Sequence, residues 1–268
     1  VYIKALQEFF RSHEETAHEW EIKGPANGGS KVYPKLDQYQ KEGYHSLIEI
    51  RNKYRGAFLC DGVGLGKTFM GLMLIERLVF HEKKNVVLFV PKSARKDVWE
   101  SHLKQYLPDV YGAFVHLEIY NHTDIGREGD FPEQFKAIAE RADAVVIDEA
   151  HNFRNPGTQG TENKPRSRYW QLSDIIGQKE CFFLTATPIN NRLIDFRHMI
   201  ELFTAREENY FSQRLGIQSL RGHFTVLEKQ FRQPDSGSGE VAETSLAEAQ
   251  EKLSIDHLFN LLIFPKFN

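Results

Sequence analysis

Cysteine is scarce in this sequence of 268 residues, which contains only Cys60 and Cys181. Each cysteine lies in an apolar run, 57–60 or 181–184, which is typical of a buried thiol in a reducing compartment. Two cysteines cannot form the dense disulfide framework of a small secreted domain, although a single bridge is compatible with the count. We therefore expect a chain stabilised by its hydrophobic core and a cytoplasmic location, associated with the nucleoid if the source is bacterial.

Long apolar runs and a strong excess of one charge are also absent. No stretch approaches the ~20 apolar residues that a membrane-spanning helix needs, so we expect no membrane partner. The formal net charge is −3, so any binding of nucleic acid has to come from a local patch. The first residues are mixed in charge, unlike a signal peptide. Because the sequence starts at Val1, we expect it to be part of a longer protein.

Short apolar runs alternate with longer amphipathic segments through the middle of the chain. Five runs are typical of strands buried on both faces: 57–60, 86–90, 115–120, 144–147 and 181–184. The segments between them, such as 68–79 and 92–106, have helical periodicity. This alternation predicts an α/β fold in which a parallel sheet is flanked by helices.

The two ends of the chain depart from this alternation. Residues 1–32 combine a helical pattern with a glycine-rich stretch and are predicted to form an N-terminal helical segment and linker. Residues 33–205 hold all five predicted strands. Beyond them, 206–268 shows helical patterns around a polar connector at 233–240. We therefore expect one α/β domain with helical additions, and no second α/β domain.

A glycine-rich loop directly follows the first predicted strand. Its sequence is Asp61-Gly62-Val63-Gly64-Leu65-Gly66-Lys67-Thr68. Glycines let backbone N–H groups converge on phosphate oxygens, and the start of the following helix favours an anion. We expect Lys67 to neutralise the β- and γ-phosphates of ATP and Thr68 to ligate Mg²⁺. The predicted ATP-binding residues of this loop are Gly62, Gly64, Leu65, Gly66, Lys67, Thr68 and Phe69.

The strict form of this phosphate-loop motif (Walker A) has glycine where this chain has Asp61. The alternative is a glycine-rich turn with an incidental Gly-Lys-Thr. The strand before the loop and the helix after it favour the phosphate loop.

Two acids follow the fourth predicted strand, in Asp148-Glu149-Ala150-His151. The carboxyl end of a parallel strand is where ligands of such folds bind. We expect Asp148 to hold Mg²⁺ and Glu149 to orient and deprotonate an attacking water, so the predicted catalytic residues are Glu149, Lys67 and Asp148. The alternative, a solvated acidic turn, is disfavoured because a phosphate loop precedes it. On its own, His151 is equally compatible with a structural role.

Three more blocks complete a family pattern. They are Leu36-Asp37-Gln38-Tyr39-Gln40-Lys41-Glu42-Gly43, Leu88-Phe89-Val90-Pro91-Lys92-Ser93 with Val98-Trp99-Glu100, and Cys181-Phe182-Phe183-Leu184-Thr185-Ala186-Thr187-Pro188. With the loop and the acidic box, they resemble the first RecA-like lobe of superfamily-2 helicase-like ATPases. The resemblance covers about 33–204 and is strongest to the Swi/Snf-related branch. Many Swi/Snf members differ at Ala186 and in the acidic box, which leaves the nearest relatives open.

The resemblance implies roles for further residues. Gln40, with Tyr39 beside it, is expected to read the adenine edge. The residues expected to couple nucleotide state to the nucleic-acid track are His151, Thr185, Ala186 and Thr187. Those expected to contact nucleic acid are Pro91, Lys92, Ser93, Arg154 and Asn155. The basic and aromatic stretch 164–170 stays open between a nucleic-acid edge and helix core.

The resemblance implies the ATP-binding lobe of a motor that couples ATP hydrolysis to movement on duplex DNA. Such a motor needs a second RecA-like lobe, whose arginines stabilise the transferring phosphoryl group. Because no second lobe is predicted, we expect this chain alone to hydrolyse ATP weakly or not at all. Two alternatives stay open: an RNA helicase lobe, and a catalytically silent nucleotide-binding module.

Overall fold

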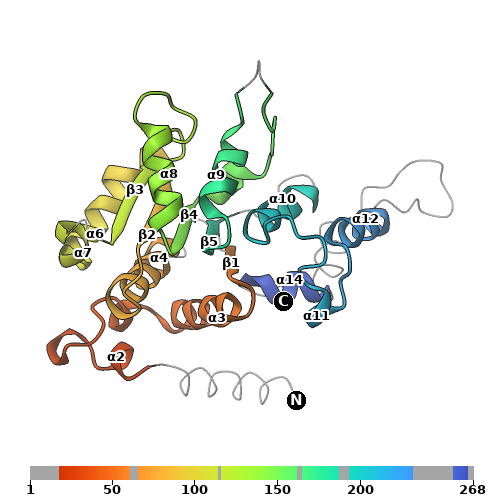
Figure 1. Cartoon of the computed structure of the whole chain (residues 1–268). Helices are drawn as coiled ribbons and strands as arrows, with labels where there is room; N and C mark the ends of the chain where they lie inside the picture. The colour runs from red at the N-terminus through yellow and green to blue at the C-terminus, as the bar shows by residue number, and fades with distance from the viewer. Residues whose placement is uncertain are drawn as a thin grey trace, which may run out of the picture.

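The core of the molecule is a parallel sheet with helices on both faces (Figure 1). The computed structural model describes residues 18–60, 66–113, 116–161, 165–186, 193–231 and 256–264. The strands are β1 Gly56–Cys60, β2 Val86–Val90, β3 Leu117–Asn121, β4 Ala144–Asp148, β5 Glu180–Thr185 and β6 Ile263–Phe264. Their order is β3-β2-β4-β5-β1-β6, and every pair is parallel. The predicted fold class is confirmed.

Four of the five predicted strands, β1, β2, β4 and β5, form because their apolar runs are buried on both faces, whereas β3 is an edge strand in which only Leu117 is buried. All five residues of β2 are buried, as are the first four of β1 and β4. A strand covered by helices on both sides needs such a continuous run, because successive side chains point to opposite faces. Two hydrophobic clusters result, one on each face of the sheet.

The helices divide between these two clusters. One face is covered by α3 Gln38–Tyr54, α4 Lys67–Glu76, α6 Ser101–Tyr106 and α7 Pro108–Ala113. The other is covered by α8 Phe131–Arg141, α9 Arg168–Ile176, α10 Leu193–Phe203, α12 Leu220–Phe231 and α14 His257–Leu262. Shorter helices are α2 Glu19–Ile22, α5 Lys92–Ala94 and α11 Ser212–Leu215. The predicted helix 92–106 is continuous but contains a π-helical stretch, Arg95–Glu100. A second π-helical stretch, Arg77–His81, extends α4.

The N-terminal segment packs on the helices of the sheet. Glu21 in α2 is fully buried; it accepts hydrogen bonds from Tyr44 Oη and, at 2.8 Å, from Arg77 Nη1. Glu76 accepts hydrogen bonds from the backbone N–H groups of Lys31, at 2.6 Å, and Val32, at 3.2 Å. Residues 18–32 therefore lie against α3 and α4. Most of the helix predicted over residues 1–20 lies outside the described residues, and its last two residues, Glu19 and Trp20, begin α2.

The C-terminal segment corrects one expectation. We expected no strand after residue 205, but Ile263 pairs with Phe58 as part of β6. The preceding helix α14 begins at Asp256, whose side chain accepts from the N–H groups of Leu258 and Phe259. Two apolar residues give too short a run to be distinguished from a helix end, and only the open edge of β1 gives them a partner.

The two cysteines are free thiols. In the parallel register of β1 and β5, Cys60 lies opposite Thr185 and Cys181 lies opposite Gly56, so the two thiols are at opposite ends of neighbouring strands. Burial raises the pKa of Cys181 well above its usual value. Among the described residues no helix is long and apolar enough to cross a membrane.

Candidate functional site

The first part of the site is the start of α4. Gly66 is the N-cap residue, with φ of 89°, and its carbonyl accepts from the N–H groups of Phe69 and Met70 at 2.9 and 3.2 Å. A helix start presents N–H groups that have no acceptor inside the helix, and its dipole favours an anion there. Lys67 and Thr68 are the first two residues of α4, at the end predicted to meet phosphate. The predicted residues Gly62, Gly64 and Leu65 lie outside the described part of the chain.

The acidic residues form the second part of the site. Asp148 is the last residue of β4, and Glu149 has the left-handed conformation, with φ of 48° and ψ of 50°. This conformation is unfavourable for a residue with a Cβ and turns the chain sharply. It explains how two adjacent acids can serve one site although neighbouring strand residues point to opposite faces.

Asp148 accepts two hydrogen bonds. Its Oδ1 accepts from the N–H of Glu149 at 3.0 Å, and its Oδ2 accepts from Trp99 Nε1 at 2.7 Å. Burial raises the pKa of Asp148, with a contribution from the negative charge of Glu149, while Trp99 and the Lys67 ammonium oppose this shift. In the sheet, β5 lies between β4, which ends at Asp148, and β1, which precedes α4 and Lys67.

His151 lies between the acidic turn and β5. Its Nδ1 is 3.1 Å from Glu149 Oε2 and 3.3 Å from the hydroxyl oxygen of Thr185, a buried residue at the end of β5. The structure thus brings together three residues to which the resemblance assigns catalysis or coupling. Ala186 follows Thr185 directly, and Thr187 lies outside the described residues.

Gln40 lies against the last glycine of the predicted loop. A Cβ added to Gly66 would fall only 2.0 Å from Gln40 Nε2. Gln40 also caps α3, because its Oε1 accepts from the N–H of Asp37 at 3.2 Å and its own N–H donates to Asp37 Oδ1 at 2.8 Å. Tyr39 packs beside it against the α3–α4 side of the core. Gln40 therefore lies next to the start of α4, and its role toward adenine stays a prediction.

The predicted nucleic-acid contacts follow the carboxyl ends of β2 and β4. Pro91 caps α5, and Lys92 and Ser93 are exposed in its first turn. Arg154 lies 3.9 Å from Asp195, and the side-chain oxygen of exposed Asn155 accepts from the N–H of Gly157 at 3.2 Å. Since parallel strands end at one edge of the sheet, these residues and the acidic turn share that edge.

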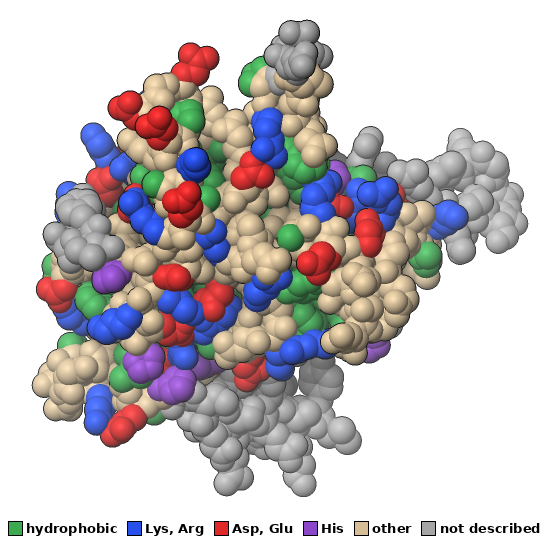
Figure 2. Space-filling view, in the orientation of Figure 1, with side chains coloured by type: hydrophobic (Ala, Val, Ile, Leu, Met, Phe, Trp, Pro, Cys, Tyr) green, Lys and Arg blue, Asp and Glu red, His purple; other side chains and the backbone are tan. Residues whose placement is uncertain are grey.

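The visible surface carries no single field of positive charge. Figure 2 shows Lys and Arg side chains interspersed with Asp and Glu across that face. The stretch 164–170, which the sequence left open, is partly core: Tyr169 is buried and its hydroxyl donates to the carbonyl of His198 at 2.8 Å. Trp170 carries the guanidinium of Arg206 over its ring, 4.0 Å from the centroid.

Two side chains near the acidic turn were not predicted to matter. Trp99 stood in a quoted motif without a role, and His122, directly after β3, was not singled out. His122 is only 4% exposed and packs edge-on against Phe153, with ring centroids 4.9 Å apart. Burial lowers its pKa to about 4, so it is neutral at pH 7. The sequence did hold a signal for Trp99: a tryptophan inside a motif is expected to be buried, and a buried indole N–H needs a hydrogen-bond acceptor.

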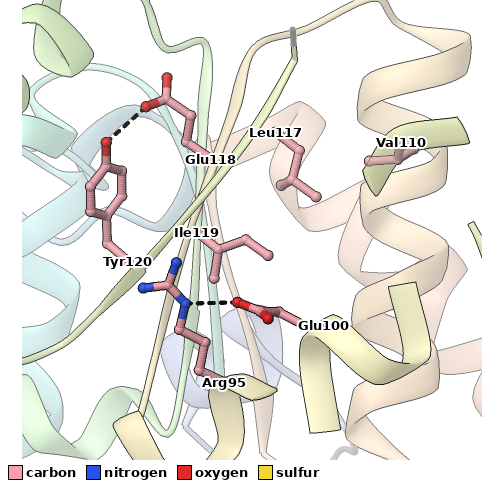
Figure 3. A pocket seen from close by; sticks show the side chains of 7 residues that line it. All are labelled: Arg95, Glu100, Val110, Leu117, Glu118, Ile119 and Tyr120. Atoms are coloured by element: carbon pink, nitrogen blue, oxygen red, sulfur yellow. Dashed lines mark hydrogen bonds and ion pairs between the residues drawn. The ribbon is translucent and has the colours of Figure 1, made fainter. Parts of the chain in front are cut away.

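A separate cavity of about 430 Å³ runs along the outer edge of β3 (Figure 3). It is lined by Arg95, Glu100, Val110, Leu117, Glu118, Ile119 and Tyr120. The Arg95–Glu100 ion pair, at 2.9 Å, crosses its lower part in Figure 3. None of the predicted ATP-binding residues line it. Within the described residues, no three His, Cys, Asp or Glu side chains cluster as a metal site.

Comparisons with known proteins agree with this arrangement. The family described as "Type III restriction enzyme, res subunit" matches residues 33–190. "Helicase SWR1" of Saccharomyces cerevisiae is 28% identical over 182 residues, covering 60% of this chain and 11% of that protein. "Uncharacterized ATP-dependent helicase YqhH" of Bacillus subtilis is 28% identical over 198 residues, covering 69% of this chain and 33% of that protein.

A solved structure shows the same fold. The "Sulfolobus solfataricus SWI2/SNF2 ATPase core domain" superposes with a TM-score of 0.50 at 17% identity, covering 85% of this chain and 42% of that one. The chain thus spans well under two thirds of each of these proteins. The family match extends over more than half of the chain and includes the phosphate loop, the acidic turn and β5. The chain therefore belongs to the family described as type III restriction enzyme, res subunit, is similar in sequence to helicases such as SWR1, and has the fold of the SWI2/SNF2 ATPase core domain.

Proposed function

We propose that this chain is the ATP–Mg²⁺-binding lobe of a motor that couples ATP hydrolysis to movement on duplex DNA. One observation carries the proposal: the start of α4, with Lys67, and the acidic turn, with Asp148 and Glu149, both follow the carboxyl ends of strands in one parallel sheet and so lie at the same edge. This set fits the ligand. A lysine and a helix start suit phosphates, while a hydroxyl and a carboxylate suit Mg²⁺.

The residues of the chain would divide the work at this edge. Lys67 would neutralise phosphate charge, and Thr68 and Asp148 would hold the metal ion, which supplies further stabilisation of phosphate charge when bound. Glu149 would orient the attacking water and accept its proton. His151, which contacts both Glu149 and Thr185, would transmit a change at the Glu149 carboxylate to β5 and the segment that follows it.

Duplex DNA is the proposed track. The exposed Lys92 and Ser93, at the edge that also bears the acidic turn, offer contacts to phosphates. The other relatives include the "ISWI chromatin-remodeling complex ATPase ISW2" of Saccharomyces cerevisiae, 26% identical over 176 residues, which supports a DNA track over RNA. Because the net charge is −3, binding would rest on a few local phosphate contacts and fall with added salt.

Turnover is proposed to need a second RecA-like lobe. Arginines supplied to the phosphoryl group from outside a nucleotide site raise such rates by about 10³–10⁵-fold. On this proposal the chain alone binds ATP–Mg²⁺ weakly and hydrolyses it slowly. Turnover by this chain alone at the rate of a two-lobed motor, abolished by Glu149→Gln, would contradict this part of the proposal.

The test is a titration of the chain with a fluorescent ATP analogue in Mg²⁺. Three proteins are compared: the wild type, Lys67→Ala, and Lys53→Ala as a matched control. Lys53 is an exposed lysine on α3 near the amino end of β1, so its loss changes the charge equally but leaves the site intact. We expect Lys67→Ala to weaken binding at least tenfold, and Lys53→Ala to bind like the wild type.

Each titration is repeated with duplex DNA and with RNA of the same sequence. Higher nucleotide affinity with duplex DNA alone supports the proposed track, while an effect confined to RNA would support an RNA helicase lobe instead. Equal binding by Lys67→Ala and the wild type would refute the proposed nucleotide site.

A further inference from the structure

Trp99 makes a contact that none of the assigned roles explains. Its side chain is completely buried, and its indole N–H donates to Asp148 Oδ2 at 2.7 Å. Asp148 is the proposed metal carboxylate, so a role for Trp99 at this carboxylate rests on the proposed function. Hydrogen bonds from a second layer of residues hold metal-ligating side chains in the orientation that binding needs.

The surroundings of Trp99 fix the ring in place. A Cβ on Gly71 of α4 would fall 2.6 Å from Trp99 Cη2 and 3.1 Å from Leu184 Cδ1, so the ring packs directly on α4 within the buried cluster that also holds Leu184 of β5. Only glycine permits this approach. Trp99 therefore touches both Asp148, at the acidic turn, and the helix that begins with Lys67.

The local backbone also contributes. Trp99 lies in the π-helical stretch Arg95–Glu100, which interrupts the helix that begins at Lys92. A π-helical turn holds an extra residue and shifts the side chains that follow it around the axis, and such turns are frequent at functional sites. The exposed Lys92 and Ser93 are thus joined by one continuous helical segment to the indole that binds Asp148.

We propose that Trp99 is a positioning residue that holds the Asp148 carboxylate in its Mg²⁺-binding orientation and ties that carboxylate to the helical segment carrying Lys92 and Ser93. With Oδ2 held by the indole and Oδ1 by the N–H of Glu149, rotation of the carboxylate requires both hydrogen bonds to break. A movement of the Lys92–Ser93 segment would thereby be transmitted to the Asp148 carboxylate through one side chain, Trp99.

The competing explanation is that Asp148 merely satisfies a buried indole. The chain supplies a matched control, because it has three tryptophans and the N–H of Trp20 is buried without an acceptor among the described residues. The Trp20 ring stacks on His81, with centroids 4.6 Å apart, in the N-terminal segment. Trp20→Phe therefore makes the same side-chain change as Trp99→Phe, at an indole whose N–H donates to no carboxylate among the described residues.

The experiment compares the wild type, Trp99→Phe and Trp20→Phe by titration with a fluorescent ATP analogue, first in EDTA and then at rising Mg²⁺. We expect all three to bind alike in EDTA. We expect Trp99→Phe to need about 10-fold or more Mg²⁺ to reach half of the Mg²⁺-dependent increase in nucleotide affinity. Substitutions of residues that hydrogen-bond metal ligands typically have effects of this size. In the Asp148→Ala background, Trp99→Phe should have no further effect on the Mg²⁺ requirement.

Equal Mg²⁺ requirements in all three proteins would overturn the inference, and so would an equal loss of affinity in EDTA and Mg²⁺, which marks a purely structural role. If Trp99→Phe does not fold, the double variant Trp20→Phe/Trp170→Phe leaves Trp99 as the sole emitting indole. Its emission should then change when Mg²⁺ joins the bound nucleotide, and no change overturns the inference. If the wild type binds no nucleotide through Lys67, the proposed function itself has failed and the inference falls with it.

Discussion

Substitution of Gly66 by alanine perturbs two features of the site at once. Gly66 has φ of 89°, a conformation that L side chains rarely adopt, and a Cβ there would meet Gln40 Nε2 at 2.0 Å. The clash is with the end of a flexible side chain, so we expect Gln40 to swing away. That movement breaks its hydrogen bond with the N–H of Asp37, which measures 3.2 Å.

The cost of Gly66→Ala has two parts. The left-handed backbone costs about 1–2 kcal/mol for a residue with a Cβ. Loss of the Gln40 cap adds about 1 kcal/mol. The chain offers a control that separates them: Gly216 has φ of 71° and no atom within 4 Å of an added Cβ, so Gly216→Ala incurs only the backbone part. We therefore expect Gly66→Ala to lower the free energy of unfolding by about 2–3 kcal/mol and Gly216→Ala by about 1–2 kcal/mol.

The functional consequence follows from the proposed role of Gln40. Gly66→Ala should reduce the preference for ATP over GTP, as Gln40→Ala should, and the double variant should lose no more than either alone. The assays are urea unfolding and competition of ATP and GTP against a fluorescent analogue, with Gly216→Ala retaining the wild-type preference. If Gly66→Ala and Gly216→Ala lose the same stability and keep the same nucleotide preference, the placement of Gln40 against the loop is wrong.

Two further predictions concern the frame around the site. Burial alone would raise the pKa of Glu82, but hydrogen bonds from Arg51, Lys84 and Arg77 hold this pKa well below its usual value. The ionised Glu82 side chain therefore stabilises the fold fully above about pH 4.5, and this stabilisation fades as the pH falls through the lowered pKa. Glu82→Gln should cost about 3 kcal/mol at neutral pH, measured by urea unfolding, and flatten the acid side of the stability profile, whereas Glu19→Gln, at an exposed ion pair, should leave the profile unchanged. Phe259 is fully buried against Phe196, with centroids 4.8 Å apart, so Phe259→Ala should cost about 3–5 kcal/mol. Val226→Ala, at a side chain that is 56% exposed, should stay within about 0.5 kcal/mol, and equal effects of these two substitutions would mean that residues 256–264 do not pack on the sheet.

The sequence predicted the sheet because its strands are continuous apolar runs. The predicted β2 has the observed bounds, Val86–Val90, and the other four predicted strands overlap their observed counterparts. Lys67 and Asp148 were predicted to share a site because parallel strands end at one edge, and the structure places both after the carboxyl ends of their strands, β1 and β4. These features follow from local patterns that one sequence displays directly.

The remaining features depend on contacts that no local pattern encodes. Ile263 joins the sheet only because the edge of β1 is open, and Tyr169 proved to be core although basic residues surround it in the sequence. The left-handed conformation of Glu149 has no sequence signal, because glycine is the residue expected there. The Trp99–Asp148 hydrogen bond joins residues 49 positions apart, through a π-helical stretch that periodicity does not reveal.

The most direct test of the central claim is the affinity of Lys67→Ala for a fluorescent ATP analogue in Mg²⁺, measured beside Lys53→Ala. The account predicts that only Lys67→Ala loses affinity, by tenfold or more, because of these two lysines only Lys67 stands at the start of α4, at the edge that bears Asp148. If the two variants bind equally well, the nucleotide does not occupy this edge of the sheet, and the assignment of an ATP-binding lobe is contradicted.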